Sequence, residues 1–91
     1  MKHFRGDKNL AVLTTRFVMS QNKPIVIVYH HKEDGMWEFV GDEDAQESDY
    51  KVVSLEEILS LDPSLSEIAD MKPGQYAVRN SDNGQWEIED L

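Results

Sequence analysis

Short apolar runs separated by polar residues predict that most of the chain forms β-strands. Residues 25–31 carry apolar side chains at both odd and even positions, a pattern typical of a central strand. Trp37 and Phe39 stand two residues apart and are therefore expected to share one face of their strand. The predicted strands are residues 10–14, 25–31, 36–40, 50–53, 75–80 and 85–89.

Glycine-containing dipeptides mark the turns between these strands. Asp34-Gly35 predicts a tight type I′ hairpin turn, which needs positive φ angles at both of its central residues. Pro73-Gly74 fits the two central positions of a type II turn. The last two strands are expected to form a hairpin around residues 81–84. One face of that hairpin is expected to carry four apolar side chains, those of Tyr76, Val78, Trp86 and Ile88.

A capping box predicts the start of the main helix. Ser54 is the expected N-cap, and Glu57 lies three residues later, where its side chain reaches back to the N-cap backbone. This helix should end by residue 61, because Asp62 precedes Pro63 and a residue before proline avoids the helical region. Asp62 is then the expected cap of a second helical turn that begins at Pro63.

Together these elements predict the α+β class. We expect an antiparallel or mixed sheet of about five strands, with one short helix at about 54–61 and a following helical turn. Residues 1–9 are polar and unpatterned, so they are expected to form a flexible N-terminal arm before a single domain over residues 10–91. No apolar run approaches the roughly 18 residues of a membrane span, and the chain starts without the apolar segment of a signal peptide. The expected location is the cytoplasm.

The charge of the chain is strongly acidic and unevenly distributed. Its net charge is −9 over 91 residues: residues 1–40 carry six Lys/Arg and four Asp/Glu, whereas residues 41–91 carry three and fourteen. Phosphate backbones and anionic lipids repel such a surface, so we expect no nucleic acid and no membrane as partner. A basic protein is the partner class that this charge favours. The simpler interpretation is that the acidity only keeps a small domain soluble.

The residue types needed for catalysis or cofactor binding are missing or badly placed. The chain has no cysteine, which excludes disulfides, thiolate catalysis and cysteine-based metal sites. His30 and His31 are adjacent in a predicted strand, where their side chains point to opposite faces and cannot hold one metal ion together. No nucleophile stands beside a general base in a recognisable pattern, and no glycine-rich phosphate loop is present. We expect no enzyme activity, no cofactor and no metal site.

The acidic segment 41–49 is the main candidate binding surface. It is expected to be an exposed loop, and it fails as an EF-hand because Gln46 and Glu47 occupy the third-ligand and glycine positions. Trp86 is a further candidate for this binding surface. It is the aromatic residue expected to be partly exposed, and Trp is favoured as an interface anchor. The candidate partner-binding residues are therefore Asp42, Glu43, Asp44, Glu47, Asp49 and Trp86.

Several motifs, in their order and spacing, resemble a known family. The strand 24–29 is followed by a Trp-x-Phe strand at Trp37–Phe39, which leads to Gly-Asp-Glu at Gly41–Glu43. A short helix then ends at Asp-Pro-Ser, residues Asp62–Ser64. Over about residues 10–90 the chain is thus similar to a bacterial domain family of unknown function, grouped with predicted immunity proteins of polymorphic toxin systems (immunity-protein family thirty-three).

The resemblance implies a non-enzymatic binding role in which the domain inhibits a partner toxin. Many toxins that act on nucleic acid are basic, and an acidic domain can cover their phosphate-binding surface. Some members have a longer loop containing Asp-Ser-Gly before the Trp-x-Phe strand, where this chain has only the Asp34-Gly35 turn. A function carried by that longer loop is therefore not expected here.

Two functions from different classes remain open at the level of sequence. The first is an acidic protein-binding domain. Its most specific form is an immunity-type protein that neutralises a basic partner toxin. The second is a small structural or regulatory domain without catalytic activity that acts through self-association, for example as a homodimer.

Overall fold

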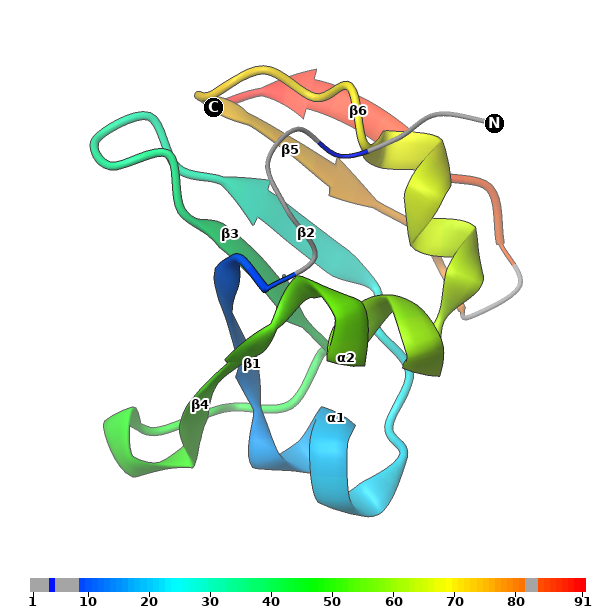
Figure 1. The fold of residues 1–91 in the computed structure, drawn as a ribbon. Coiled ribbons are helices and arrows are strands. Elements are labelled where there is room, and N and C mark those ends of the chain that lie inside the picture. Colours follow the sequence, from blue (N-terminus) through cyan, green and yellow to red (C-terminus); the bar gives the residue numbers. More distant parts are fainter. Residues whose placement is uncertain (1–3, 5–8, 82–83) are drawn as a thin grey trace.

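The computed structural model describes residue 4, residues 9–81 and residues 84–91 of the chain, and it confirms the α+β class (Figure 1). The sheet is mixed and has six strands, one at each of the six segments predicted as strands, although the expected sheet had about five. The strands are β1 (Ala11–Thr15), β2 (Ile27–His30), β3 (Trp37–Val40), β4 (Tyr50–Ser54), β5 (Gln75–Val78) and β6 (Glu87–Asp90). The helices are α1 (Arg16–Gln21), α2 (Leu55–Leu61) and two 3₁₀-helices, η1 (Glu47–Asp49) and η2 (Pro63–Ile68).

The strand order is β4-β1-β3-β2-β5-β6, with β4 and β6 at the two edges. Only β1 and β3 pair in parallel; the other neighbouring strands are antiparallel. The strand predicted to be central, β2, does lie between two others. The predicted hairpin between β2 and β3 is also present, but its turn is not type I′, because Gly35 has a positive φ of 73° and Asp34 does not. The loop between β2 and β3 is longer than a two-residue turn. In it, Gly35 N donates to His31 O at 2.9 Å, an i→i+4 hydrogen bond.

The helix starts follow the predicted local chemistry. Ser54 caps α2 by accepting from Glu57 N, and the Glu57 side chain accepts from the Ser54 backbone, which confirms the capping box. Asp62 caps η2 by accepting from Ser64 N at 3.1 Å, with Pro63 at the first helical position. The Pro73-Gly74 turn is also as predicted: Gly74 has a φ of 94°, and Gln75 N donates to Lys72 O.

One face of the sheet carries the hydrophobic core. Val12, Val28, Phe39 and Ala77 point to this face and have no exposed surface. They pack against residues from three helical segments, namely Val18 of α1, Leu55 and Ile58 of α2, and Leu65 and Ile68 of η2. Figure 1 shows α2 and the yellow-green η2 lying across the same side of the sheet. We call the opposite side of the sheet the open face.

The register of the last hairpin differs from the prediction. Tyr76 is paired with Glu89, and Ala77 with Ile88. Tyr76 and Val78 therefore lie on the open face, whereas Ile88 lies on the core side, so the prediction that these side chains share a face is wrong. Because side chains alternate along a strand, a difference of one residue in the pairing is enough to exchange the faces.

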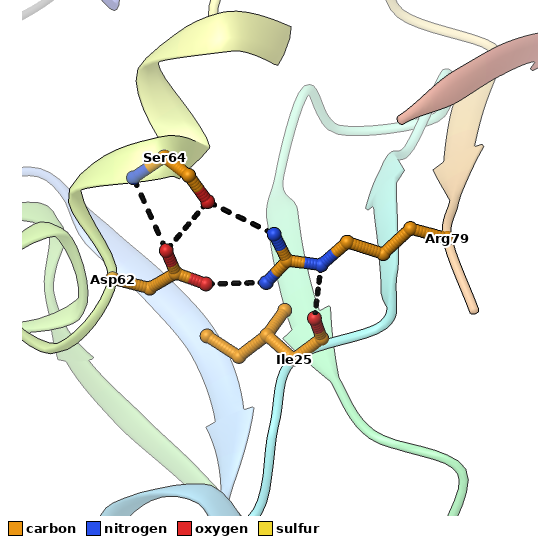
Figure 2. A network of polar contacts seen from close by, with 4 residues as sticks. All are labelled: Ile25, Asp62, Ser64 and Arg79. Carbon is orange, nitrogen blue, oxygen red and sulfur yellow. Dashed lines mark hydrogen bonds and ion pairs between the residues drawn. The ribbon is translucent and has the colours of Figure 1, made fainter. Parts of the chain in front are cut away.

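A buried arginine joins the sheet to the helical layer (Figure 2). The side chain of Arg79, which follows β5, is only 1% exposed and pairs with Asp62. Its Nη1 donates to Ser64 Oγ at 2.9 Å, and its Nε donates to Ile25 O at 2.9 Å. The guanidinium also lies 4.1 Å from the centre of the Trp86 ring. All of these partners come from segments distant in sequence or from the last hairpin.

The predicted N-terminal arm, residues 1–9, lies outside the described residues except for Phe4 and Asn9. The Phe4 ring packs edge-on against Trp37, with the ring centres 4.8 Å apart. Within the described residues, no helix has the length and apolar character needed to cross a membrane.

Removing one partner of the buried pair should destabilise the fold strongly. D62A leaves the Arg79 charge buried without its carboxylate, so we expect the free energy of unfolding to fall by about 3–5 kcal/mol. The double variant D62A/R79M should recover part of this loss, because the unpaired buried charge is gone. Urea denaturation measures both values. The exposed E33Q serves as a control, with a change within about 0.5 kcal/mol, and a D62A variant as stable as E33Q would contradict the prediction.

Candidate functional site

The open face carries a continuous row of side chains that crosses all six strands. Paired residues in neighbouring strands share a face, and the pairing runs from β4 through β1, β3, β2 and β5 to β6. The row consists of Val52, Leu13, Glu38, Tyr29, Tyr76 and Glu89. Val52 is 66% exposed, and the aromatic and aliphatic members nearer the centre are half-buried. An acidic side chain thus stands at the centre of a largely apolar row, and another at its end.

Aromatic rings are stacked along the open face. The Tyr29 and Tyr76 rings lie 6.1 Å apart with an angle of 26° between their planes. The His31 ring lies on the other side of Tyr29, 5.7 Å away and inclined by 17°. Both tyrosines are half-buried. A tyrosine presents apolar ring surface together with a polar hydroxyl group, a combination that is favoured at interfaces.

Glu38 places a negative charge beside these rings. Its Oε1 lies 2.8 Å from His31 Nε2, a hydrogen bond when that nitrogen carries the proton. Burial of Tyr29, and next the charge of Glu38, raise the pKa of the Tyr29 hydroxyl above its ordinary value. The hydroxyl therefore remains a neutral donor.

A cleft of about 300 Å³ lies between the open face and residues 41–45. The rings of Tyr29 and Tyr50 contribute to its lining, as does Thr15 at the end of β1. Four carboxylates line it as well, those of Glu38, Asp42, Glu43 and Asp44. No Lys, Arg or His among the described residues lines this cleft, which we call the acidic cleft. Its charge is therefore suited to a cation.

Gly41 brings the acidic segment close to the sheet. A Cβ atom at this position would lie 2.4 Å from Glu43 Oε1 and 2.8 Å from Pro24 O, so no larger residue fits without a shift. As a result, Glu43 Oε1 has less than 1 Å² of accessible surface and no hydrogen-bond partner among the described residues. Buried acceptors without a donor are uncommon in native proteins.

The structure places the predicted binding residues in four different surroundings. Asp42, Glu43 and Asp44 lie together in the acidic cleft, and the first and last of them are exposed. Glu47 is exposed on η1 but does not line the cleft. The expectation that the whole segment is an exposed loop is wrong at Gly41 and Asp49, both of which are buried.

Asp49 stabilises the loop instead of presenting a charge to solvent. Its Oδ1 accepts from Arg16 Nε at 2.7 Å, and its Oδ2 accepts from Gln46 N at 2.8 Å. The backbone hydrogen bond from Gln46, followed by the hydrogen bond from Arg16, holds the pKa of Asp49 below its ordinary value. These contacts fix the η1 turn to the start of α1, so both oxygens of Asp49 are already paired within the chain.

Trp86 also lies apart from the acidic cleft. It is half-buried, packs against the hydrophobic core and stacks on Arg79. Its location on the core side separates it from the row on the open face.

The residues at the centre of the site were not among the predicted binding residues. Tyr29, Glu38, Tyr50 and Tyr76 all lie on the open face or in the acidic cleft. One signal was available: Trp37 and Phe39 share the core face, so Glu38 between them must point to the other side. Whether that side is covered by a further layer cannot be read from strand alternation.

His30 is part of the core packing. Its ring stacks on Trp37 with the centres 3.9 Å apart, and its Nδ1 lies 2.9 Å from Met71 O. Within the described residues no three His, Asp or Glu side chains are grouped so that they could hold a metal ion. His30 therefore belongs to the core packing and not to the candidate site on the open face.

Comparison of the chain with protein-family models, with curated proteins and with solved structures finds no match. The resemblance to the immunity-protein family stays a prediction, and the site is interpreted from its own geometry.

The contacts of Asp49 predict part of the pH dependence of stability. Because its pKa is lower in the folded state, ionised Asp49 stabilises the fold fully above the ordinary value of about 4. This contribution is lost as the pH falls through the lowered folded-state pKa. D49N should therefore flatten the acid limb of stability against pH, measured by urea denaturation over a pH series. The neighbouring exposed E47Q is the control, and wild type and D49N curves that stay parallel at acid pH would rule the prediction out.

Replacing Glu38 should lower the pKa of Tyr29. E38Q removes the neighbouring negative charge but leaves the burial, so the pKa should move partway back toward its ordinary value of about 10. An absorbance titration of tyrosinate measures this shift, with Y29F identifying the Tyr29 component. E33Q carries the same substitution in the β2–β3 loop and should leave the titration unchanged. An E38Q titration identical to that of the wild type would show that Glu38 does not act on Tyr29.

Proposed function

We propose that this protein is a protein-binding domain, without catalytic activity, whose open face and acidic cleft bind a basic protein. The observation that carries the proposal is the row of side chains across the six strands, which no described helix covers. Its centre is aromatic and aliphatic, and the acidic cleft adjoins it. An apolar centre with a charged margin is the usual arrangement of a protein interface, and exposed apolar patches commonly mark such sites.

The charge of the site supports a basic partner. Four carboxylates line the acidic cleft without a basic residue from the described part of the chain, and the whole protein has a net charge of −9. A complementary surface rich in Lys and Arg would be attracted at long range, and association would slow as salt screens the charges. Like-charged proteins, nucleic acids and anionic membranes would be repelled by the same field.

The specific form of the proposal is an immunity-type protein that neutralises a basic toxin in the cytoplasm. The support for it is the resemblance of the Trp-x-Phe, Gly-Asp-Glu and Asp-Pro-Ser motifs, together with the charge of the site. The Gly-Asp-Glu motif, Gly41–Glu43, contributes directly to the lining of the acidic cleft. An acidic domain of this kind would act by covering the phosphate-binding surface of its target.

Self-association is the second candidate, and the edge strand β4 favours it. β4 lies at one end of the strand order, and its residue Val52 is 66% exposed on the open face. An unpaired edge with exposed apolar residues can pair with a second copy of the chain. The charge of −9 on each copy opposes this association, which is why we place it second.

The experiment is an affinity capture from a lysate of the source organism at low and moderate salt, with two matched double variants. D42N/D44N removes two exposed charges from the acidic cleft, and E33Q/E56Q removes two exposed charges elsewhere. We expect one basic protein to be retained in stoichiometric amount by the wild type and by E33Q/E56Q. D42N/D44N should bind it about tenfold more weakly, since each surface charge pair contributes up to about 1 kcal/mol.

Two outcomes would contradict the proposal. Equal binding by the two double variants would show that the acidic cleft is not the contact surface. No captured protein, together with a dimer mass that depends on concentration, would favour self-association through β4.

A further inference from the structure

The two edges of the sheet differ in charge. β6 carries three carboxylates among its four residues, and all four side chains are exposed. Such charges keep an edge strand from pairing with another chain. β4 carries no carboxylate, and its one charged residue is Lys51. Tyr50 and Val52 are exposed apolar residues of this strand. β4 is therefore the edge that is open to a further strand.

The hydrogen-bond pattern of β4 shows which of its backbone groups face the edge. Leu55 N donates to Leu10 O just beyond the paired residues of β4 and β1. Hydrogen-bonded pairs alternate along an antiparallel ladder, so residues 51 and 53 direct their backbone groups at β1, and residues 50, 52 and 54 direct theirs outward. β4 is the last strand of the sheet, so no other described strand meets these outward groups.

Val52 is the residue through which this edge can pair. The outward N–H groups on either side of it are used within the chain, because Tyr50 N donates to Glu47 O and Ser54 N donates to Glu57 Oε1. Val52 between them offers both a donor and an acceptor. Such a residue is complementary to itself about a two-fold axis, where each copy donates to the carbonyl of the other. The edge thus fits a second copy of the chain.

Lys51 gives this pairing a favourable charge contact. In an antiparallel pair centred on Val52, Lys51 of one copy lies opposite Val53 of the other copy. Both residues are on the core side of the sheet, where Val53 packs against the core. α2 begins on this side two residues after Val53, and its first turn carries the exposed Glu56. Each copy would therefore bring its lysine toward the acidic start of the other copy's α2.

We propose that β4 pairs two copies of this chain across a two-fold axis that passes beside Val52. The two six-stranded sheets then form one continuous sheet, and their open faces join into one surface. The second copy thereby extends the candidate site, and it leaves the open face uncovered for a partner. The contact is short, and the net charge of −9 on each copy opposes it at long range, so a weak dimer is expected.

The first test is sedimentation equilibrium of the wild type, V52P and I88P over a wide range of protein concentration. V52P removes the outward N–H and leaves the hydrogen bonds to β1 intact, and proline is tolerated in this position on an edge strand. I88P is the matched control, because Ile88 N–H points outward from β6. We expect the wild type and I88P to show the same concentration-dependent dimer, and V52P to stay monomeric at those concentrations.

Cross-linking tests the two-fold register and does not depend on V52P folding normally. The chain has no cysteine, so V52C introduces a single thiol. The Cα atoms of a hydrogen-bonded antiparallel pair are about 5.5 Å apart, a distance that a disulfide spans. Under mild oxidation V52C should form a disulfide-linked dimer several-fold faster than I88C, in which the thiol is on the other edge.

A charge exchange tests the contact between Lys51 and Glu56. K51E and E56K each replace two attractive pairs in the dimer with repulsive ones, and each should weaken dimerisation by about tenfold. K51E/E56K restores opposite charges with their positions exchanged and should recover dimerisation close to that of the wild type.

Four results would overturn the inference: a monomeric wild type at every concentration, equal dimerisation of the wild type and V52P, equal cross-linking of V52C and I88C, or no recovery in K51E/E56K. Loss of the dimer in I88P would do so as well, because it would indicate that β4 pairs with β6 of another copy. A monomer that captures a basic protein through β4, shown by loss of capture in V52P, would reject the dimer and leave the proposed function standing. A dimer that depends on Val52 supports the inference whether or not a basic protein is captured.

Discussion

The fold depends on the burial of one guanidinium group. A cation with 1% of its side chain exposed is stable only if its donors are paired, and Arg79 pairs with Asp62, Ser64 and the carbonyl of Ile25. These partners belong to the start of η2 and to the segment before β2. A single side chain thereby attaches the end of β5 to the helical layer. Asp62 also caps η2, so the same carboxylate begins the 3₁₀-helix and neutralises the arginine.

This attachment and the core contacts of Leu55, Ile58, Leu65 and Ile68 hold α2 and η2 on one side of the sheet, and the other side stays open. A chain of 91 residues has enough apolar side chains for one core. The row from Val52 to Glu89 is therefore exposed at its ends and partly exposed at its centre, which would favour association with other apolar surfaces. The carboxylates beside it would disfavour surfaces of the same charge. The acidity would thus have two consequences under the proposed function, because it would oppose nonspecific contacts and favour a basic partner.

Acidic residues within one short segment have different roles because different donors lie within their reach. Asp49 accepts from the Gln46 backbone and from Arg16, and its charge is used to hold the η1 turn. Asp42 and Asp44, a few residues earlier, remain exposed, and Glu43 between them is fixed against Gly41. Residue type alone gives all of them the same expected role. The distinction comes from two donors, the nearby Gln46 backbone and the side chain of Arg16, which is more than thirty residues earlier in the chain.

The sequence by itself determined the features that depend on neighbouring residues. The capping box at Ser54, the end of α2 before Pro63 and the turn at Pro73-Gly74 rely on contacts within a few positions, so the local pattern was sufficient. Only the tertiary structure decided the parallel pairing of β1 with β3, the register of β5 with β6 and the burial of Arg79. It also decided which face of the sheet stays open, and with it the grouping of Tyr29, Glu38 and the acidic segment. These features join residues far apart in the chain, and alternation along a strand shows that two faces exist without showing which one another layer covers.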